Sequence, residues 1–216
     1  MKKLSLIFIL GLFYSCQIQY DVSTRFVFEG QVNDRDGNPI DNNAVEAWIY
    51  NSNDSDLIGF TTTNADGNFT LIIPEPINEN EFALKIKGGS VYSQKEYVNI
   101  WQSDFINYKL NLGEVTLIKG DDISQLQITL NHVTAENSIS FIEVTGIMAD
   151  QIVWVNSFEN DYPYYYNYDT YYRDVAKNQT LNLYYEVSNV ITGQTESFSE
   201  SIVVESDNVT PYTLNY

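Results

Sequence analysis

The chain has 216 residues, of which 44% are apolar and 19% are charged, so it is long enough to bury one or two hydrophobic cores. Its 29 acidic residues outnumber its 11 basic residues and give a formal charge of −18. Nucleic-acid binding needs clustered Lys and Arg, so we expect no nucleic acid among the partners. An acidic surface of this kind is typical of a protein that stays soluble and separate from its neighbours.

The residue types favour strands over helices, and the residues that most often form catalytic or metal sites, His and Cys, are scarce. The 17 Tyr and 11 Phe, together with many Thr, Val and Ile, are typical of β-structure. A single Cys excludes an intramolecular disulfide, and the single His, His132, excludes any site that needs two imidazoles. We therefore expect no catalytic residues, no metal and no cofactor, and we interpret His132 as an ordinary strand residue.

The N-terminus has the pattern of a secretory signal. Lys2 and Lys3 precede an apolar run over residues 4–12, which is too short to span a bilayer of about 30 Å as a helix. The only Cys of the chain, Cys16, follows directly, at the position where a bacterial lipoprotein is cut and acylated. The sequence therefore predicts a signal peptide over residues 1–15, and ordinary secretion with an incidental Cys is the alternative.

The residues in front of Cys16 resemble the lipobox of bacterial lipoproteins. Ser15 is an accepted small residue, whereas Phe13 stands where Leu is usual. The resemblance implies lipidation of Cys16, a membrane partner reached through that anchor, and a polar tether over residues 16–24. We expect the protein in the cell envelope, at the outer membrane of a Gram-negative bacterium, with the membrane face left open.

Residues 25–119 alternate apolar and polar side chains in short runs, which predicts about seven antiparallel strands. Asp36-Gly37 and Asp66-Gly67 provide residues that tolerate positive φ in tight turns between these runs. The expected strands cover residues 25–32, 44–50, 57–63, 69–73, 82–87, 97–101, 107–112 and 112–117.

Two motifs in this half resemble a known domain. The stretch G-Q-V-N-D-R-D-G-N-P-I-D-N-N-A-V runs from Gly30 to Val45, and T-N-A-D-G-N-F runs from Thr63 to Phe69. They resemble the carboxypeptidase regulatory-like, or transthyretin-like, β-sandwich domain over residues 25–119. The resemblance implies a seven-stranded accessory module without chemistry of its own. The paired His and Glu ligands of metallocarboxypeptidases and the several His residues of transthyretin-related hydrolases are missing.

The first turn also suggests calcium, because Asp34, Asp36 and Asn38 resemble the start of an EF-hand loop. In that register the sixth position should be Gly and the twelfth Glu, but Pro39 and Val45 stand there. We therefore interpret both Asp-Gly stretches as turns and predict no metal site.

A second domain is expected over residues 120–216. Gly120-Asp121-Asp122 follows the last strand of the first domain, and new strand patterns begin after it. The pattern predicts another antiparallel sandwich, immunoglobulin-like or fibronectin-like, so that the whole chain is all-β with two antiparallel β-sandwich domains. The expected strands cover residues 126–132, 138–144, 151–158, 180–190, 195–205 and 210–216.

Residues 159–172 are rich in tyrosine and form the strongest candidate for binding. Tyrosine offers a large apolar face with a hydroxyl at its rim, which suits stacking on sugar rings or contact with a protein. The alternative is that the rings pack on one another and cover the sandwich. The candidate ligand-binding residues are Tyr162, Tyr164, Tyr165, Tyr166, Tyr168, Tyr171 and Tyr172.

The sequence favours a lipid-anchored, non-catalytic protein of the cell envelope that binds or scaffolds a partner. The alternative is a carbohydrate-binding accessory lipoprotein that uses the tyrosines of 159–172. The expected partner is a protein or a neutral glycan, since the flanking acids Glu159, Asp161 and Asp169 disfavour anions.

Overall fold

The computed structural model describes residues 18–51, 54–78, 80–156 and 170–216, and these form strands with two short 3-10 helices. The predicted signal peptide 1–15 and Cys16 lie outside the described residues. The strands of the first half are β1 (Tyr20–Asp34), β2 (Ala44–Asn51), β3 (Asp54–Thr62), β4 (Asn68–Pro76), β5 (Glu81–Ile86), β6 (Lys95–Ile100) and β7 (Lys109–Leu117).

The second half continues the all-β pattern. Its strands are β8 (Ile123–Asn131), β9 (Asn137–Thr145), β10 (Ile152–Trp154), β11 (Thr170–Ala176), β12 (Gln179–Asn189), β13 (Thr195–Val204) and β14 (Val209–Asn215). The 3-10 helices are η2 (Gln102–Asp104) and η3 (Gly120–Asp122). Among the described residues no helix is long and apolar enough to cross a membrane.

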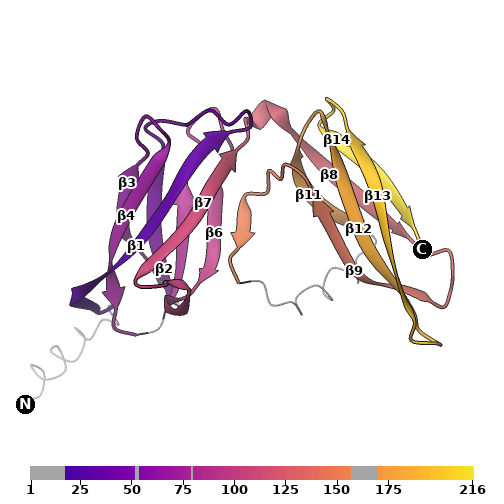
Figure 1. Cartoon of the computed structure of the whole chain (residues 1–216), viewed down its shortest axis with the longest axis horizontal. Coiled ribbons are helices and arrows are strands. Elements are labelled where there is room, and N and C mark those ends of the chain that lie inside the picture. Colours follow the sequence, from indigo (N-terminus) through magenta and orange to yellow (C-terminus); the bar gives the residue numbers. More distant parts are fainter. Residues whose placement is uncertain (1–17, 52–53, 79, 157–169) are drawn as a thin grey trace, which may run out of the picture.

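The strands form four sheets, which pack as two sandwiches. The first sandwich has the sheets β4-β1-β7 and β10-β6-β5-β2-β3, and the second has β11-β8-β14 and β13-β12-β9. Figure 1 shows the two sandwiches side by side, with β10 on the side of the first that faces the second. The predicted all-β sandwich fold is confirmed. Most strand pairs are antiparallel as expected, but β1 with β7, β8 with β14, and β10 with β6 are parallel.

The two sandwiches repeat one topology. In each, the first strand pairs antiparallel with the fourth and parallel with the seventh. In each, the second strand pairs antiparallel with the fifth, and the fifth with the sixth. The third strand breaks the repeat, because β3 pairs with β2, whereas β10 leaves β9 and pairs with β6 of the first sandwich.

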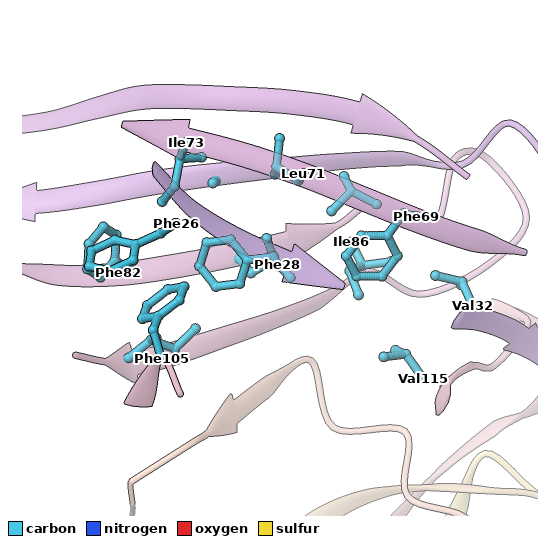
Figure 2. Close-up of a cluster of buried hydrophobic side chains, with 14 of the residues drawn as sticks. Phe26, Phe28, Val32, Phe69, Leu71, Ile73, Phe82, Ile86, Phe105 and Val115 are labelled. Carbon is cyan, nitrogen blue, oxygen red and sulfur yellow. The ribbon is translucent and has the colours of Figure 1, made fainter. Parts of the chain in front are cut away.

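Each sandwich has its own core. In the first, Phe26, Phe28, Phe82 and Phe105 form an aromatic cluster, with Phe26 and Phe105 stacked at 4.4 Å between ring centroids. Figure 2 shows these rings between the two sheets, with Ile73, Leu71 and Phe69 arranged along one strand above them. The second core contains Leu126, Ile128, Ile142, Val144, Tyr171, Val175, Leu181, Leu183, Tyr185, Ile202 and Leu214.

The two predicted Asp-Gly turns have the same geometry. The Asp34 carboxylate accepts hydrogen bonds from the backbone N–H groups of Asp36 and Asn38, each at 2.9 Å. In the second turn the Asn64 side-chain oxygen accepts the equivalent hydrogen bonds from the N–H groups of Asp66 and Asn68. Gly37 and Gly67 have φ of 82° and 74°, as a turn at these positions requires. The interpretation of Asp34 as a turn residue is therefore confirmed.

Several strand predictions need correction. The tether is shorter than 16–24, because Tyr20 to Thr24 begin β1. The strands expected over 107–112 and 112–117 are the single strand β7, since the chain passes Gly113 at φ 67° without a turn. Strand β11 was not predicted, and the strand expected over 151–158 is β10, which joins the first sandwich instead of the second. The boundary between 119 and 120 stays a prediction.

The junction between the sandwiches is built from backbone and small apolar residues. Ile118, Ala149 and Ala176 are fully buried together. The Lys95 ammonium donates to the Met148 carbonyl at 3.4 Å, and its burial lowers its pKa, although Asp150 acts in the opposite direction. The β10–β6 pairing adds ladder hydrogen bonds to these contacts, so the two halves meet through main chain as well as side chains.

Candidate binding surface

The structure describes only two of the seven predicted tyrosines. Tyr162, Tyr164, Tyr165, Tyr166 and Tyr168 lie outside the described residues, as does Cys16. Tyr171 and Tyr172 are neighbours on β11, so they point to opposite faces of the sheet. Tyr171 is 9% exposed and belongs to the second core, whereas Tyr172 is 56% exposed. Of the two, only Tyr172 offers its ring to a ligand.

The C-terminal end of the tyrosine-rich stretch is held by a salt bridge. The Arg173 guanidinium donates to the Asp150 carboxylate at 2.6 and 2.9 Å and to the Tyr171 hydroxyl at 2.7 Å. Burial opposes the charge on Arg173, but Asp150 and Tyr171 outweigh it and raise the pKa of Arg173 above its usual range. Arg173 is therefore occupied within the fold and is not a free cation for a ligand.

Asn156, which precedes that stretch in the sequence, is held on the first sandwich. The Asn156 amide donates to the Asn99 carbonyl at 3.0 Å and to the Asp104 carboxylate at 2.6 Å, and the Asn99 amide donates back to the Asn156 carbonyl. The Trp101 indole donates to the Asn99 side chain at 2.8 Å.

The strongest candidate surface on the described residues is the outer face of the five-stranded sheet. An apolar row crosses all five strands of this face. Leu57 of β3 pairs with Trp48 of β2, which pairs with Ala83 of β5. Ala83 lies opposite the irregular part of β6, where Val98 pairs with Trp154 of β10. We call this row, Leu57, Trp48, Ala83, Val98 and Trp154, the apolar row.

The apolar row spans the sheet and is partly open to solvent. Four strand spacings of about 4.8 Å make it about 19 Å long. Leu57 is 42% exposed and Trp154 is 59% exposed at its two ends, Trp48 and Val98 are half-buried, and Ala83 between them is fully buried. Large apolar side chains that share one exposed face are typical of contact surfaces rather than of a solvated sheet face.

Paired charges form a second row beside the apolar one. Lys85 contacts Glu96 at 3.3 Å and lies over the Trp48 ring, 5.1 Å from its centroid. Lys87 contacts Glu46 at 3.1 Å, and the Trp48 indole donates to the same Glu46 at 3.0 Å. Two bases thus pair with two acids on this face, and Glu81, in register with Tyr50, is a further acid there.

The pKa values of this row agree with mutual pairing. Burial opposes the charge of Lys85, but Tyr50 and Glu96 outweigh it and raise the pKa of Lys85. Burial likewise opposes the charge of Glu46, but hydrogen bonds from Trp48 and Lys87 lower its pKa. Lys85 and Glu46 are therefore both stabilised in their charged forms, the opposite of a base or acid tuned for proton transfer near neutral pH.

The other chemical candidates are occupied within the fold. The His132 ring stacks on Tyr216 with centroids 5.1 Å apart and an interplanar angle of 13°. In the part of the chain that the structure describes, no three His, Cys, Asp or Glu side chains are grouped to hold a metal ion. Chemically, the described surface can make apolar, aromatic and hydrogen-bonding contacts.

Sequence reasoning missed the apolar row for a clear reason. The sequence pattern predicts strands at Trp48 and at Trp154, but in two different domains. Only the pairing of β10 with β6 brings them onto one sheet. The available signal was the exposed-face position of both tryptophans in alternating strand patterns.

No family model matches the chain, and no curated protein matches it in sequence. Among solved structures, it is similar to the shaft pilin SpaA of Lactobacillus rhamnosus GG, with 9% identity, a TM-score of 0.34, and coverage of 89% of this chain and 98% of the pilin. It is also similar to a 9R-lipoxygenase from Cyanothece PCC8801, with 16% identity and a TM-score of 0.32 over 52% of this chain. A third is the 3-chlorocatechol 1,2-dioxygenase of Rhodococcus opacus 1CP, with 14% identity and a TM-score of 0.33 over 49% of this chain.

The chain spans 20% of the lipoxygenase and 62% of the dioxygenase. These similarities are too distant to carry a function.

Proposed function

We propose that this protein is a lipid-anchored, non-catalytic module of the bacterial cell envelope that binds or scaffolds a partner through its first sandwich. Residues 25–119 would be the carboxypeptidase regulatory-like module, and Cys16 the acylated residue that holds it at the outer membrane. The observation that carries the proposal is the outer face of the five-stranded sheet, where the apolar row lies beside two acid–base pairs.

The partner that fits this face is neutral and presents apolar or aromatic groups. Trp48 and Trp154 supply the side-chain type that most often contributes strongly to binding. The net negative charge of the chain repels anionic partners. A neutral partner is not repelled and can approach this face closely.

The contact test uses crosslinking in intact cells with the acylated protein. Trp154→Ala and Leu57→Ser remove exposed ends of the apolar row without opening the core. Trp154→Ala should lower the yield of crosslinked partner about tenfold, which corresponds to the loss of a contact of about 1.4 kcal/mol, and Leu57→Ser should lower it by a smaller factor because it removes a smaller side chain. Ile72→Ser is the matched control, because Ile72 is 60% exposed on the opposite sheet. Equal losses in all three variants, or none, would contradict the proposal.

The anchor is tested separately with Cys16→Ala. This change should block acylation and leave an unprocessed precursor, as mass spectrometry of the N-terminus would show. An unmodified N-terminus in the natural protein, beginning at a residue other than Cys16, would refute the lipoprotein assignment.

A second candidate function is carbohydrate binding by the tyrosine-rich stretch. It is favoured by two exposed aromatic residues, Trp154 before that stretch and Tyr172 as its last residue. Replacing Tyr164, Tyr165, Tyr166 and Tyr168 by Ser should abolish binding to a neutral oligosaccharide array and leave the melting temperature unchanged. If the melting temperature falls sharply and array binding persists, the tyrosines belong to the fold.

A further inference from the structure

The second sandwich has an open end. Every second side chain of β13 faces the interior of the sandwich. Ile202 and Val204 are buried there, as this alternation requires. At the other end of the same strand Glu196, Phe198 and Glu200 keep the inward register but remain exposed. The two sheets therefore do not close over this end.

This open end is a cavity of about 330 Å³. Its walls combine three aromatic rings with four amide side chains and one carboxylate. Such a volume lies within the range of small-molecule sites. Its lining includes Tyr185, Phe198, Tyr216, Asn137, Gln194 and Asn215.

The aromatic wall is rigid before any ligand arrives. Phe198 stacks on Tyr185 with centroids 5.2 Å apart and an interplanar angle of 19°, and Phe198 remains 40% exposed. The Tyr185 hydroxyl donates to Glu200 at 2.7 Å, and Tyr212 donates to the same carboxylate. A ring fixed on one face and open on the other is a stacking platform with little entropy to lose on binding.

The polar wall is held by loops at the cavity rim. The Asn189 side chain accepts hydrogen bonds from the N–H groups of Ile191 and Thr192, and Asn189 N–H donates to the Gln194 carbonyl at 2.8 Å. Asn131 donates to the side-chain oxygen of Asn215 at 2.7 Å. No hydrogen bond within the described residues occupies the side chains of Asn137, Gln194 or Glu196.

Amides both donate and accept hydrogen bonds, which matches the hydroxyl groups of a sugar, and an aromatic face matches the C–H face of its ring. Residues 120–216 carry 14 acids against 2 bases, a net of −12, which disfavours an acidic sugar. We propose that this cavity binds one residue of a neutral sugar, with Phe198 as the stacking platform and Asn137, Gln194 and Asn215 as hydrogen-bonding partners of its hydroxyls. The site shares no residue with the apolar row, so either can fail alone.

The test is saturation-transfer NMR and calorimetry on the whole chain. The probes are galactose, glucose, mannose and N-acetylglucosamine, with N-acetylneuraminic acid as the anionic and choline as the cationic counter-probe. At least one neutral sugar should bind, and Phe198→Ala should weaken it about tenfold or more, since the stacking contact is lost. Gln194→Ala should weaken it severalfold and cannot disturb the core, because Gln194 is exposed on a loop.

Two further variants sharpen the outcome. Phe141→Ala is the matched control on a different strand, since Phe141 contacts Tyr184 and does not line the cavity. Glu196→Gln separates the ligand classes, because it keeps hydrogen-bonding capacity and removes the charge. Retained sugar binding in Glu196→Gln supports a neutral ligand. Binding of choline that Glu196→Gln abolishes, sugar binding unaffected by both Phe198→Ala and Gln194→Ala, or no binding of any neutral sugar would each overturn the proposal.

Discussion

The two sandwiches share one strand order and differ in the placement of a single strand. In the first, β3 closes the sheet beside β2, and in the second the equivalent β10 crosses to the first sandwich. This difference indicates that the loop before an edge strand determines which strand it can pair with. Alternation of apolar residues defines a strand but does not choose its neighbour.

The loop before β10 explains the crossing. Met148 makes a bridge with Val175, and Ala149 N–H donates to the Asp174 carbonyl at 2.8 Å. Asp150 then binds Arg173. These contacts attach the chain to β11 rather than β9, so β10 emerges beside β6. The β2–β3 connection is short and keeps its two strands together, as in an ordinary hairpin.

The largest expected effects separate the two cores. Phe28→Ala should destabilise the first sandwich by about 3 to 5 kcal/mol, and Ile128→Ala should destabilise the second by about 2 to 5 kcal/mol, because both side chains are fully buried. Hydrogen exchange followed by mass spectrometry would locate each loss. Protection that falls equally in both sandwiches for either variant would show that they unfold as one unit.

Replacing the glycines of the two Asp-Gly turns by alanine should reduce stability by unequal amounts. A Cβ at Gly67 would lie 2.4 Å from the Val32 carbonyl, whereas a Cβ at Gly37 meets nothing within 4 Å. Gly37→Ala should therefore cost about 1 to 2 kcal/mol for its positive φ alone, and Gly67→Ala clearly more. Urea unfolding of the two variants measures the difference, and equal costs would refute the packing argument.

Breaking the pairing of β10 with β6 should have a local effect on stability. Val153→Pro removes a donor from the middle of β10, and proline is poorly tolerated within a sheet ladder. Exchange of the Glu96 and Val155 amides, which donate to Gln151 and Val98, should quicken, while the global stability falls by only about 1 kcal/mol. The control is Val203→Pro on the edge strand β13. Unchanged exchange at Glu96 would mean that β10 is not held by this ladder.

The smallest effects are differences in pH dependence. Burial opposes the charge of Asp34, but hydrogen bonds from Asn38 and Asp36 outweigh it and lower the pKa below the usual 3.8. That stabilisation is present above pH 3.8 and is lost as the pH falls through the lower pKa of the folded state, so Asp34→Asn should flatten the acid side of the stability curve.

The pKa of Asp174 in the second sandwich is shifted in the opposite direction to that of Asp34. Burial, with help from Asp150, raises the pKa of Asp174, so its charged form opposes folding above that pKa and the opposition disappears as the pH falls. Asp174→Asn should slightly stabilise the second sandwich at pH 7 and have no such benefit at pH 3. Thermal scans across this range measure both, and a loss of stability at pH 7 would contradict the sign.

Much of the first sandwich could be predicted because its signals are local. Asp34 and Gly37 specify a turn within five residues, and Phe26 and Phe28 alternate on one strand face. The signals failed where a contact joins distant residues. Tyr171 and Tyr172 read alike in the sequence, yet one is core and the other surface, because strand parity decides and β11 was not predicted.

The sequence by itself determined the all-β character, the positions of the Asp-Gly turns and the strong acidity, since each depends on residue type and near neighbours. Only the tertiary structure decided that β10 joins the first sheet, that Trp48 and Trp154 therefore share one face, and that the inner face of β13 stays open around Phe198. The physical reason is that sheet pairing and closure are set by how loops and cores pack across the whole molecule, whereas alternation records only which side of a strand each residue faces.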